Sequence, residues 1–452
     1  MADGTRINKA EIDGDIIATD DIGGQKYQRV KLVHGVDGVN NGDVAKSNPL
    51  PVDMAEDSLS RDSFSRLRVS TPNYLFDAQL TYDLQPILFE AVTSGSGATV
   101  THDATNRMAL MTFSSTGTGG KAYMQSYEWC RYQPGRSQLI FITFNFIEHK
   151  ANVLKFAGYS DGNNGVELQS NGSGFQLTLY SDTGHADETV AQASWNIDPM
   201  DGTGPSGKTL QVSKAQILVI DFQALYVGRV RVALDIDGVL YPIHQFTHAN
   251  VDATPYIQNA SLPVRCGMTC TGTVSTTMNF ICSSVMSEGG QDALGYQFST
   301  EGMATAGNGA RTHVLSVQPA TTFNSIANRS KFILEGLDIA VTGNAPIKWE
   351  LCLGDVLTGS NTFSVVNSTY SAFQQNSAGT TSGAPEIVIA QGYVAASATV
   401  KGVSQNTSRD MRYPVTLDAA GAVRAMGRLT VLATGIGAGS AMRAVLNWRE
   451  IR

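Results

Sequence analysis

Two histidines near the middle of the chain have a spacing that could serve metal binding. His244 and His248 are four residues apart around a predicted strand end, and Asp235 and Asp237 precede them. Imidazole nitrogens and carboxylate oxygens are ligands that Zn²⁺ takes in proteins. The ordinary alternative is one packed and one exposed histidine. We favour that alternative, and we predict neither a metal site nor a cofactor.

Other candidate chemistry is equally weak. The oxygen-rich run at residues 161–165, DGNNG, is similar to a fragment of a calcium loop, but Glu167 follows too soon to be the later acidic ligand. We interpret the run as a turn. Glu128, Asp221 and Asp235 could supply the paired carboxylates of a glycoside hydrolase, whose spacing is a property of the fold. No phosphate-binding loop, GxSxG or HExxH motif is present. We therefore predict no catalytic residues and no enzyme activity.

A cluster of aromatic residues and arginines is the stronger signal. Aromatic rings with arginine are typical of interface hot spots and of sugar-binding platforms. Ordinary core packing is the alternative interpretation. The residues that we predict for an interface between subunits are Tyr123, Tyr127, Trp129, Arg131 and Tyr132, with Arg136 nearby.

The composition indicates a β protein with a neutral, hydroxyl-rich surface. The chain has 452 residues, 45 of them Gly, and only 16% are charged, against roughly 25% in ordinary soluble domains. The net charge of −8 and the singly spread Lys and Arg residues argue against nucleic-acid binding.

The five cysteines and the hydropathy pattern exclude further classes. Cys266 and Cys270 are four apart in a predicted strand, about 13 Å along it, which is too far for a disulfide. We expect the cysteines to be small buried side chains. The most apolar run, residues 139–147, is far too short to span a membrane. The first residues lack the pattern of a signal peptide, so we expect synthesis in a cytoplasm.

Strand signals begin near residue 74. Residues 139–147 form a strand that we expect to be covered on both sides, and residues 217–222 form another. Residues 230–246 predict a hairpin around Asp237-Gly238, because this dipeptide tolerates the positive φ of a tight turn. Residues 264–285 read as a second hairpin with its turn at 271–273. The 230–246 hairpin resembles the strand pairs of concanavalin-like or laminin-G-like sandwiches, which concerns architecture alone.

A second β region follows a domain boundary that we place near residue 295. The run from Met442 to Ile451 alternates apolar and polar residues, and we expect a half-buried strand there. Residues 354–384 are rich in Ser, Thr, Asn and Gly and predict a long surface loop or hairpin tip. No α-helix and no internal repeat is visible. The other strands predicted in this region are 331–341, 347–353, 386–390 and 428–433.

The N-terminal region has a different character. Residues 1–23 are polar and acidic and predict a tail, and residues 58–73 predict a linker. Between them, Tyr27 to Val33 alternates like a strand, a Gly/Asp/Asn-rich turn follows, and Pro49-Leu50-Pro51 is stiff. Such a segment is too small to fold alone and predicts an attachment arm. The arm residues are Tyr27, Arg29, Val30, Leu32, Val33, Pro49, Leu50 and Pro51.

Residues 24–52, GQKYQRVKLVHGVDGVNNGDVAKSNPLPV, resemble N-terminal segments of tailed-bacteriophage virion proteins. The resemblance implies a structural protein on the particle surface: a fibre or spike of the tail or neck, or a decoration protein of the head. It implies virion localisation, other virion proteins as partners and a homo-oligomer, commonly a trimer. Host attachment through a surface glycan fits the same picture.

The fold class that we predict is mainly β. A tail, arm and linker occupy residues 1–73, a jelly-roll or concanavalin-like sandwich residues 74–295, and a second β-sandwich residues 296–452. In this hypothesis the arm attaches the protein to the particle by adding a strand to a neighbouring subunit. The alternative is a carbohydrate-binding receptor-recognition protein or a glycanase. We predict no nucleic-acid partner and no membrane insertion.

Overall fold

The computed structural model divides the chain into two compact units, residues 1–58 and residues 59–452. We call the second unit the body and describe each unit by itself. The residues that the structure describes are 3–6, 16–22, 24–28, 61, 62, 66, 68, 71–292, 294–354, 357–359, 362–381, 385, 387–396, 402–405 and 413–452.

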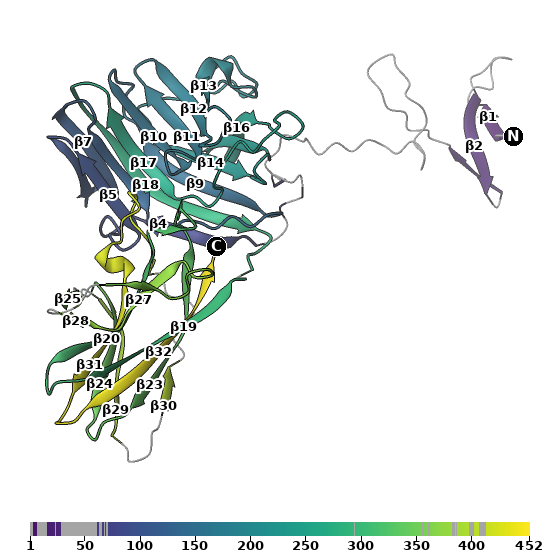
Figure 1. Ribbon diagram of the computed structural model, residues 1–452. Helices are drawn as coiled ribbons and strands as arrows, with labels where there is room; N and C mark the ends of the chain where they lie inside the picture. The colour runs from purple at the N-terminus through teal and green to yellow at the C-terminus, as the bar shows by residue number, and fades with distance from the viewer. Residues whose placement is uncertain are drawn as a thin grey trace. The chain divides into compact units, whose positions relative to one another are not determined.

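The N-terminal unit contains a three-stranded antiparallel sheet of β1 (Asp3–Arg6), β2 (Ile16–Ile22) and β3 (Gln25–Gln28) (Figure 1). The prediction of a tail for residues 1–23 was therefore wrong for β1 and β2. Within the predicted arm strand, Tyr27 lies in β3 and pairs with Asp20 of β2. The other predicted arm residues, Arg29, Val30, Leu32, Val33, Pro49, Leu50 and Pro51, lie outside the described residues.

The first part of the body is a sandwich of two antiparallel sheets. Apolar side chains of both sheets meet in one core that runs from Phe76 to Val285. The seven-stranded sheet has the order β13 (Glu188–Ala191), β12 (Gly174–Tyr180), β11 (Gly165–Asn171), β10 (Val153–Ser160), β17 (Val264–Cys270), β8 (Lys121–Ser126) and β5 (Phe89–Ser94). The eight-stranded sheet has the order β16 (Val239–Phe246), β15 (Val230–Ile236), β14 (Gln216–Phe222), β9 (Ser137–Asn145), β18 (Val274–Glu288), β7 (Met108–Thr116) and β6 (Ala98–Asp103), and β4 (Asn73–Gln79) also pairs with β18.

Local sequence explains several of these strands. In β9, Ile140, Ile142 and Phe144 are fully buried in the core, because alternate side chains of a strand point to one face. The other face of β9 is only half-buried at Phe141 and Thr143. The predicted Asp237-Gly238 hairpin is confirmed: β15 pairs with β16, and the two turn residues have φ of +55° and +80°.

The predicted hairpin at residues 264–285 was wrong. β17 pairs with β10 and β8 in one sheet, whereas β18 pairs with β7, β9 and β4 in the other. The turn at residues 271–273 therefore carries the chain from one sheet of the sandwich to the other. Each strand is apolar on the side that faces the shared core. Placing β17 and β18 in opposite sheets therefore buries their apolar sides just as effectively as pairing them in one sheet.

The second part of the body is a smaller β-sandwich with its own core, which runs from Ala304 to Trp448. The predicted alternation of β32 is confirmed, since Met442, Ala444, Leu446 and Trp448 are fully buried. One sheet has the order β19 (Tyr296–Thr305), β32 (Ala441–Ile451), β23 (Lys331–Val341) and β30 (Gly402–Gln405). The other has the order β26 (Ser364–Val365), β27 (Phe373–Asn376), β20 (Arg311–Pro319), β31 (Leu429–Gly435), β24 (Ile347–Leu353) and β29 (Ile387–Val394).

The region predicted as a long surface loop or hairpin tip, residues 354–384, contains the short strands β25 to β28. β27 joins the six-stranded sheet beside β20, and Phe373 in it is fully buried. The prediction was wrong there because polar residues flank the apolar Ala372-Phe373 pair, so the sequence shows no strand pattern around it. Two small two-stranded sheets are also present: β21 (Thr322–Phe323) with β22 (Ile326–Ala327), and β25 (Leu357–Gly359) with β28 (Gly379–Thr381).

The fold class is thus mainly β, with a jelly-roll-type sandwich followed by a second sandwich. In the part of the chain that the structure describes, the helices are two short 3₁₀ turns, η1 (Gln192–Ser194) and η2 (Ala425–Gly427). No helix of that part is long and apolar enough to cross a bilayer.

Candidate binding cavity between the two sandwiches

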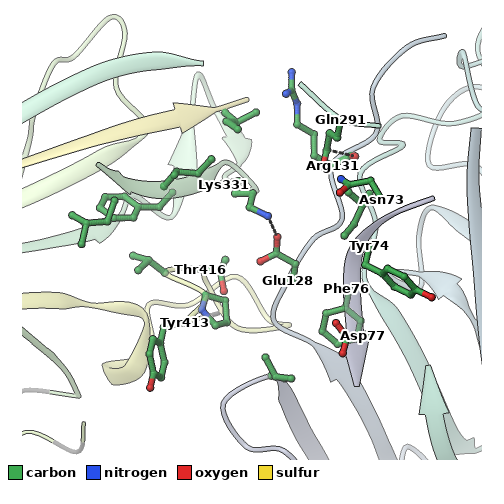
Figure 2. A pocket seen from close by; sticks show the side chains of 18 of the residues that line it. Asn73, Tyr74, Phe76, Asp77, Glu128, Arg131, Gln291, Lys331, Tyr413 and Thr416 are labelled. Carbon is green, nitrogen blue, oxygen red and sulfur yellow. Dashed lines mark hydrogen bonds and ion pairs between the residues drawn. The ribbon is translucent and has the colours of Figure 1, made fainter. Parts of the chain in front are cut away.

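A cavity of about 630 Å³ lies where the two sandwiches of the body meet (Figure 2). The first sandwich supplies β4 and the segment after β8, and the second supplies the start of β23 and residues 413–416. The lining residues that the argument uses are Asn73, Tyr74, Glu128, Lys331, Phe332 and Thr416.

An ion pair crosses this cavity. Lys331, the first residue of β23, donates a hydrogen bond to Glu128 Oε1, two residues beyond the end of β8. Figure 2 shows the two side chains pointing toward one another. The Glu128 carboxylate raises the pKa of Lys331 above its ordinary value, although burial acts in the opposite direction. Lys331 therefore stays protonated at neutral pH, and its contact with Glu128 joins the two sandwiches.

Three polar groups in the cavity wall have hydrogen-bonding capacity that a ligand could use. Thr416 Oγ1 is buried, and no described residue forms a hydrogen bond with it. Glu128 uses one carboxylate oxygen for Lys331, and we find no donor to the other within the described ranges. Asn73 is exposed at the start of β4. These groups converge on a space that apolar side chains also line, which is the usual character of a small-molecule site.

Beside the cavity, two arginines of the second sandwich stack on aromatic rings of the first. The guanidinium carbon of Arg424 lies 3.5 Å from the ring centroid of Tyr127, and that of Arg329 lies 4.0 Å from the ring centroid of Trp129. Burial lowers the pKa of both arginines below the ordinary value. Desolvated cation–π contacts of this kind are worth about 2 kcal/mol each. They fix the geometry of the cavity wall.

A hydrogen bond at the same junction also joins the two sandwiches. Glu90 of β5 accepts from the backbone N–H of Ala419 at 2.7 Å, and burial raises the pKa of its carboxyl. Arg329 Nη1 donates to the carbonyl of Asp418 at 3.1 Å. The loop of residues 413–428 is thereby held against the edge of the seven-stranded sheet.

The structure separates the five residues that we predicted for an interface. Tyr127 and Trp129 contact the second sandwich of the same chain, and Arg131 lines the cavity and donates at 3.4 Å to the carbonyls of Asp292 and Leu294. Tyr132 lies in the core with its hydroxyl on Gln223 O. An interface between subunits remains a prediction for these residues.

The fifth residue, Tyr123, lies elsewhere. The guanidinium of Arg265 stacks over Tyr123 at 4.6 Å and over Phe156 at 4.4 Å, and Arg265 also reaches the buried carboxylate of Glu167. Glu167 further accepts from Ser160 and Gln169. The Glu167 carboxylate thus has its partners, Arg265, Ser160 and Gln169, within the seven-stranded sheet.

The motifs considered for metal binding are engaged in other contacts, and the favoured expectation of one exposed histidine was wrong, since His244 and His248 are both buried. His244 Nδ1 accepts from the backbone N–H of Asn196, whereas His248 bonds to Glu188 at 2.8 Å and stacks on Tyr256. Asp161 accepts from the N–H groups of the next residues in a turn, as predicted. No group of three potential ligands that could hold a metal occurs among the residues described.

The three carboxylates considered for glycoside hydrolysis are not brought together as a pair. Asp221 binds Arg231 and Arg68, while Asp235 caps its own turn by accepting from Gly238 N–H. They face the same side of adjacent strands, but Asp235 pairs with Ile217, four residues from Asp221, which places them about 13 Å apart along the strands. Glu128 lies two residues beyond β8 of the seven-stranded sheet and lines the cavity.

Sequence reasoning missed Lys331, Arg329, Thr416 and Arg424. Each lies 197 or more residues beyond the end of the aromatic cluster, residue 132, and has no motif around it. Only the packing of the second sandwich on the first brings them to Glu128, Tyr127 and Trp129. An unusual density of aromatic residues at 123–132 was the one signal available.

No family model and no curated protein matches the chain. Solved structures match the chain at low similarity. A glycosyl hydrolase family protein from Mycobacterium fortuitum is 12% identical, covering 47% of this chain and 99% of that one, with a TM-score of 0.32. A family 16 glycosyl hydrolase protein from Mycobacterium smegmatis is 12% identical, covering 47% and 100%, with a TM-score of 0.30. A protein of unknown function from Shewanella oneidensis is 12% identical, covering 50% and 91%, with a TM-score of 0.31. Scores of this size carry no inference about activity.

Proposed function

We propose that the chain is a structural protein on the surface of a tailed-phage particle, attached through its N-terminal unit. The observation that carries the proposal is the division into a small β unit, residues 1–58, and a large body, residues 59–452. The small unit includes the whole of the segment, residues 24–52, that resembles virion attachment segments. A protein that attaches with one part and presents another needs this organisation.

The edge strand of the small sheet supports a mode of attachment. In the described part of that sheet the order is β1-β2-β3, so β3 is paired on one side by β2. Its other edge offers backbone N–H and C=O groups to a strand of a neighbouring protein. Pro49 and Pro51 reduce the conformational entropy that the following segment loses on docking.

The body supports the presenting role. Its two sandwiches are joined by an ion pair, Lys331 to Glu128, and by the arginine–aromatic stacks of Arg424 and Arg329. Contacts of this kind oppose relative movement of the sandwiches. Two sandwiches held together by such contacts suit a protein that is presented on the surface of a particle.

The test is incorporation into particles. Phage that lack the protein are complemented with the full chain, with residues 59–452 alone, or with the full chain carrying Tyr82→Ala, an exposed change in the body. We expect the full chain and the Tyr82→Ala form on purified particles, and the truncated body folded but absent. Incorporation of the truncated body at the level of the full chain would contradict attachment through the N-terminal unit.

A further inference from the structure

We propose that the cavity between the two sandwiches binds a neutral oligosaccharide, a ligand with many hydroxyl groups and no net charge. The inference goes beyond the proposed function, because it concerns a site in the body and not attachment to a particle. The volume of about 630 Å³ lies within the range of small-molecule sites, roughly 300–1,000 Å³.

The first support is the buried hydroxyl of Thr416. Its Oγ1 has no hydrogen-bond partner among the described residues, although it is buried in the cavity wall. A buried polar atom without a partner destabilises the fold, because it loses its hydrogen bonds to water. Once the half-buried Thr416 side chain turns toward the cavity, a ligand hydroxyl supplies both a donor and an acceptor for this group.

The second support is the Glu128–Lys331 pair in the middle of the cavity. Glu128 Oε1 accepts from Lys331, and no described residue donates to Oε2. A lysine ammonium has three N–H donors, and the hydrogen bond from Lys331 to Glu128 uses one of them. The pair thus presents an acceptor and donors within one ligand's reach, as Figure 2 shows. Adjacent hydroxyls of a sugar ring match such a set, because each hydroxyl both donates and accepts.

The third support is the apolar part of the lining. Phe332, Leu88 and Val415 contribute apolar surface to the lining. The C–H faces of a sugar ring are apolar and pack on such surfaces while the hydroxyls point to polar groups. A purely apolar ligand would leave Thr416 Oγ1 and the second carboxylate oxygen of Glu128 without a hydrogen bond.

The charges of the lining argue against an ionic ligand. Five charged residues line the cavity, and most are already neutralised: Lys331 pairs with Glu128, and Asp292 pairs with Arg136 at 2.7 Å. Arg131 is bonded to backbone carbonyls. An anionic saccharide would meet the second carboxylate oxygen of Glu128. The cavity therefore selects a neutral ligand.

The test measures binding to the purified full chain in solution. A glycan array of neutral oligosaccharides identifies a candidate, and isothermal titration calorimetry then compares it with trigalacturonate as an acidic saccharide of similar size. The variants are Thr416→Val, which keeps the shape and removes the hydroxyl, and Asn73→Ala. Thr99→Val, an exposed threonine of β6, is the matched control.

We expect at least one neutral oligosaccharide to bind and trigalacturonate not to bind. Thr416→Val should weaken binding about tenfold, the loss that one hydrogen bond of a buried group produces. The same variant should unfold at an equal or higher denaturant concentration, because the hydroxyl has no partner in the fold. Asn73→Ala should weaken binding about threefold, and Thr99→Val should leave it unchanged.

Three results would overturn the inference: no neutral oligosaccharide of the array binds, Thr416→Val binds as tightly as the native chain, or trigalacturonate binds more tightly than the neutral ligands. Each is obtained without particles. Failure here leaves the incorporation result unaffected, and failure of incorporation leaves the binding result unaffected.

Discussion

Lys331 and Glu128 form an ion pair that joins the two sandwiches of the body, from the first residue of β23 to the segment after β8. The two residues are separated by 203 positions in sequence. Their side chains are 37% and 18% exposed, so the pair is partly shielded from solvent. This contact defines the cavity and fixes how the two sandwiches meet.

A double-mutant cycle measures this pair. We expect Glu128→Gln and Lys331→Met each to lower the free energy of unfolding, with a coupling energy of about 1 kcal/mol, because removing one partner leaves the other shielded and unpaired. Urea unfolding supplies the four free energies. The Arg443–Glu301 pair, 3.9 Å apart and largely exposed, is the matched control and should show coupling near zero. Equal coupling in the two pairs would contradict a special role for Lys331 and Glu128.

The stacking of Arg424 on Tyr127 should matter more than an exposed cation–π contact. Arg424→Met should lower the free energy of unfolding by about 2 kcal/mol, since the guanidinium is desolvated at the junction. Arg424→Lys should not restore it, because an ammonium lacks the planar face. Lys208→Met, which removes the 5.9 Å contact with Tyr241, is the control and should cost under about 0.5 kcal/mol. Full restoration by lysine would rule out stacking as the cause.

His313 should make the second sandwich sensitive to mild acid. It is buried in β20, its Nε2 lies 2.8 Å from Ser316 Oγ, and burial lowers its pKa from 6.5 to about 4. Between these values the unfolded state binds a proton that the folded state does not, so stability falls as pH decreases from 6.5 to 4. The loss reaches about 3 kcal/mol at pH 4 and below.

The check is the pH dependence of urea unfolding for the native chain and for His313→Gln. Carboxyl groups titrate in the same range, so the difference between the two curves is the relevant quantity. That difference should change by up to about 3 kcal/mol across the range and then level off. Parallel curves would show that His313 is not the titrating group.

Gly158 is required by the close approach of two strands. A Cβ there would lie 2.2 Å from Val166 O on the neighbouring strand β11 and would meet Glu167 as well. Gly158→Ala should lower the free energy of unfolding by about 3 kcal/mol, because the strands must move apart. At Gly184 a Cβ meets nothing within 4 Å, so Gly184→Ala should change stability by less than about 0.5 kcal/mol. Similar effects of both substitutions would contradict the packing that the structure shows.

Local signals predicted part of this fold. The Asp237-Gly238 hairpin and the alternation of β32 were recognised because a tight turn and a half-buried strand each leave a short-range pattern. The 264–285 hairpin was wrong because a turn such as 271–273 looks alike whether the next strand pairs or crosses to the facing sheet. That choice depends on the whole core.

The cavity could not be predicted in the same way. The aromatic cluster was recognised, but the partners of Tyr127 and Trp129 are arginines of the second sandwich, Arg424 and Arg329. Nothing near residues 329 or 424 marks them as different from other arginines. The orphan hydroxyl of Thr416 is visible only once burial is known.

The central claim is that the protein is part of a virion surface, and immunogold labelling of purified particles tests it most directly. The antibody is raised against residues 296–452, the region of the second sandwich. We predict label on the particles: on the tail or neck for a fibre or spike, or over the head for a decoration protein. Absence of label from all particles, with the protein detected in the same lysate, would contradict the claim.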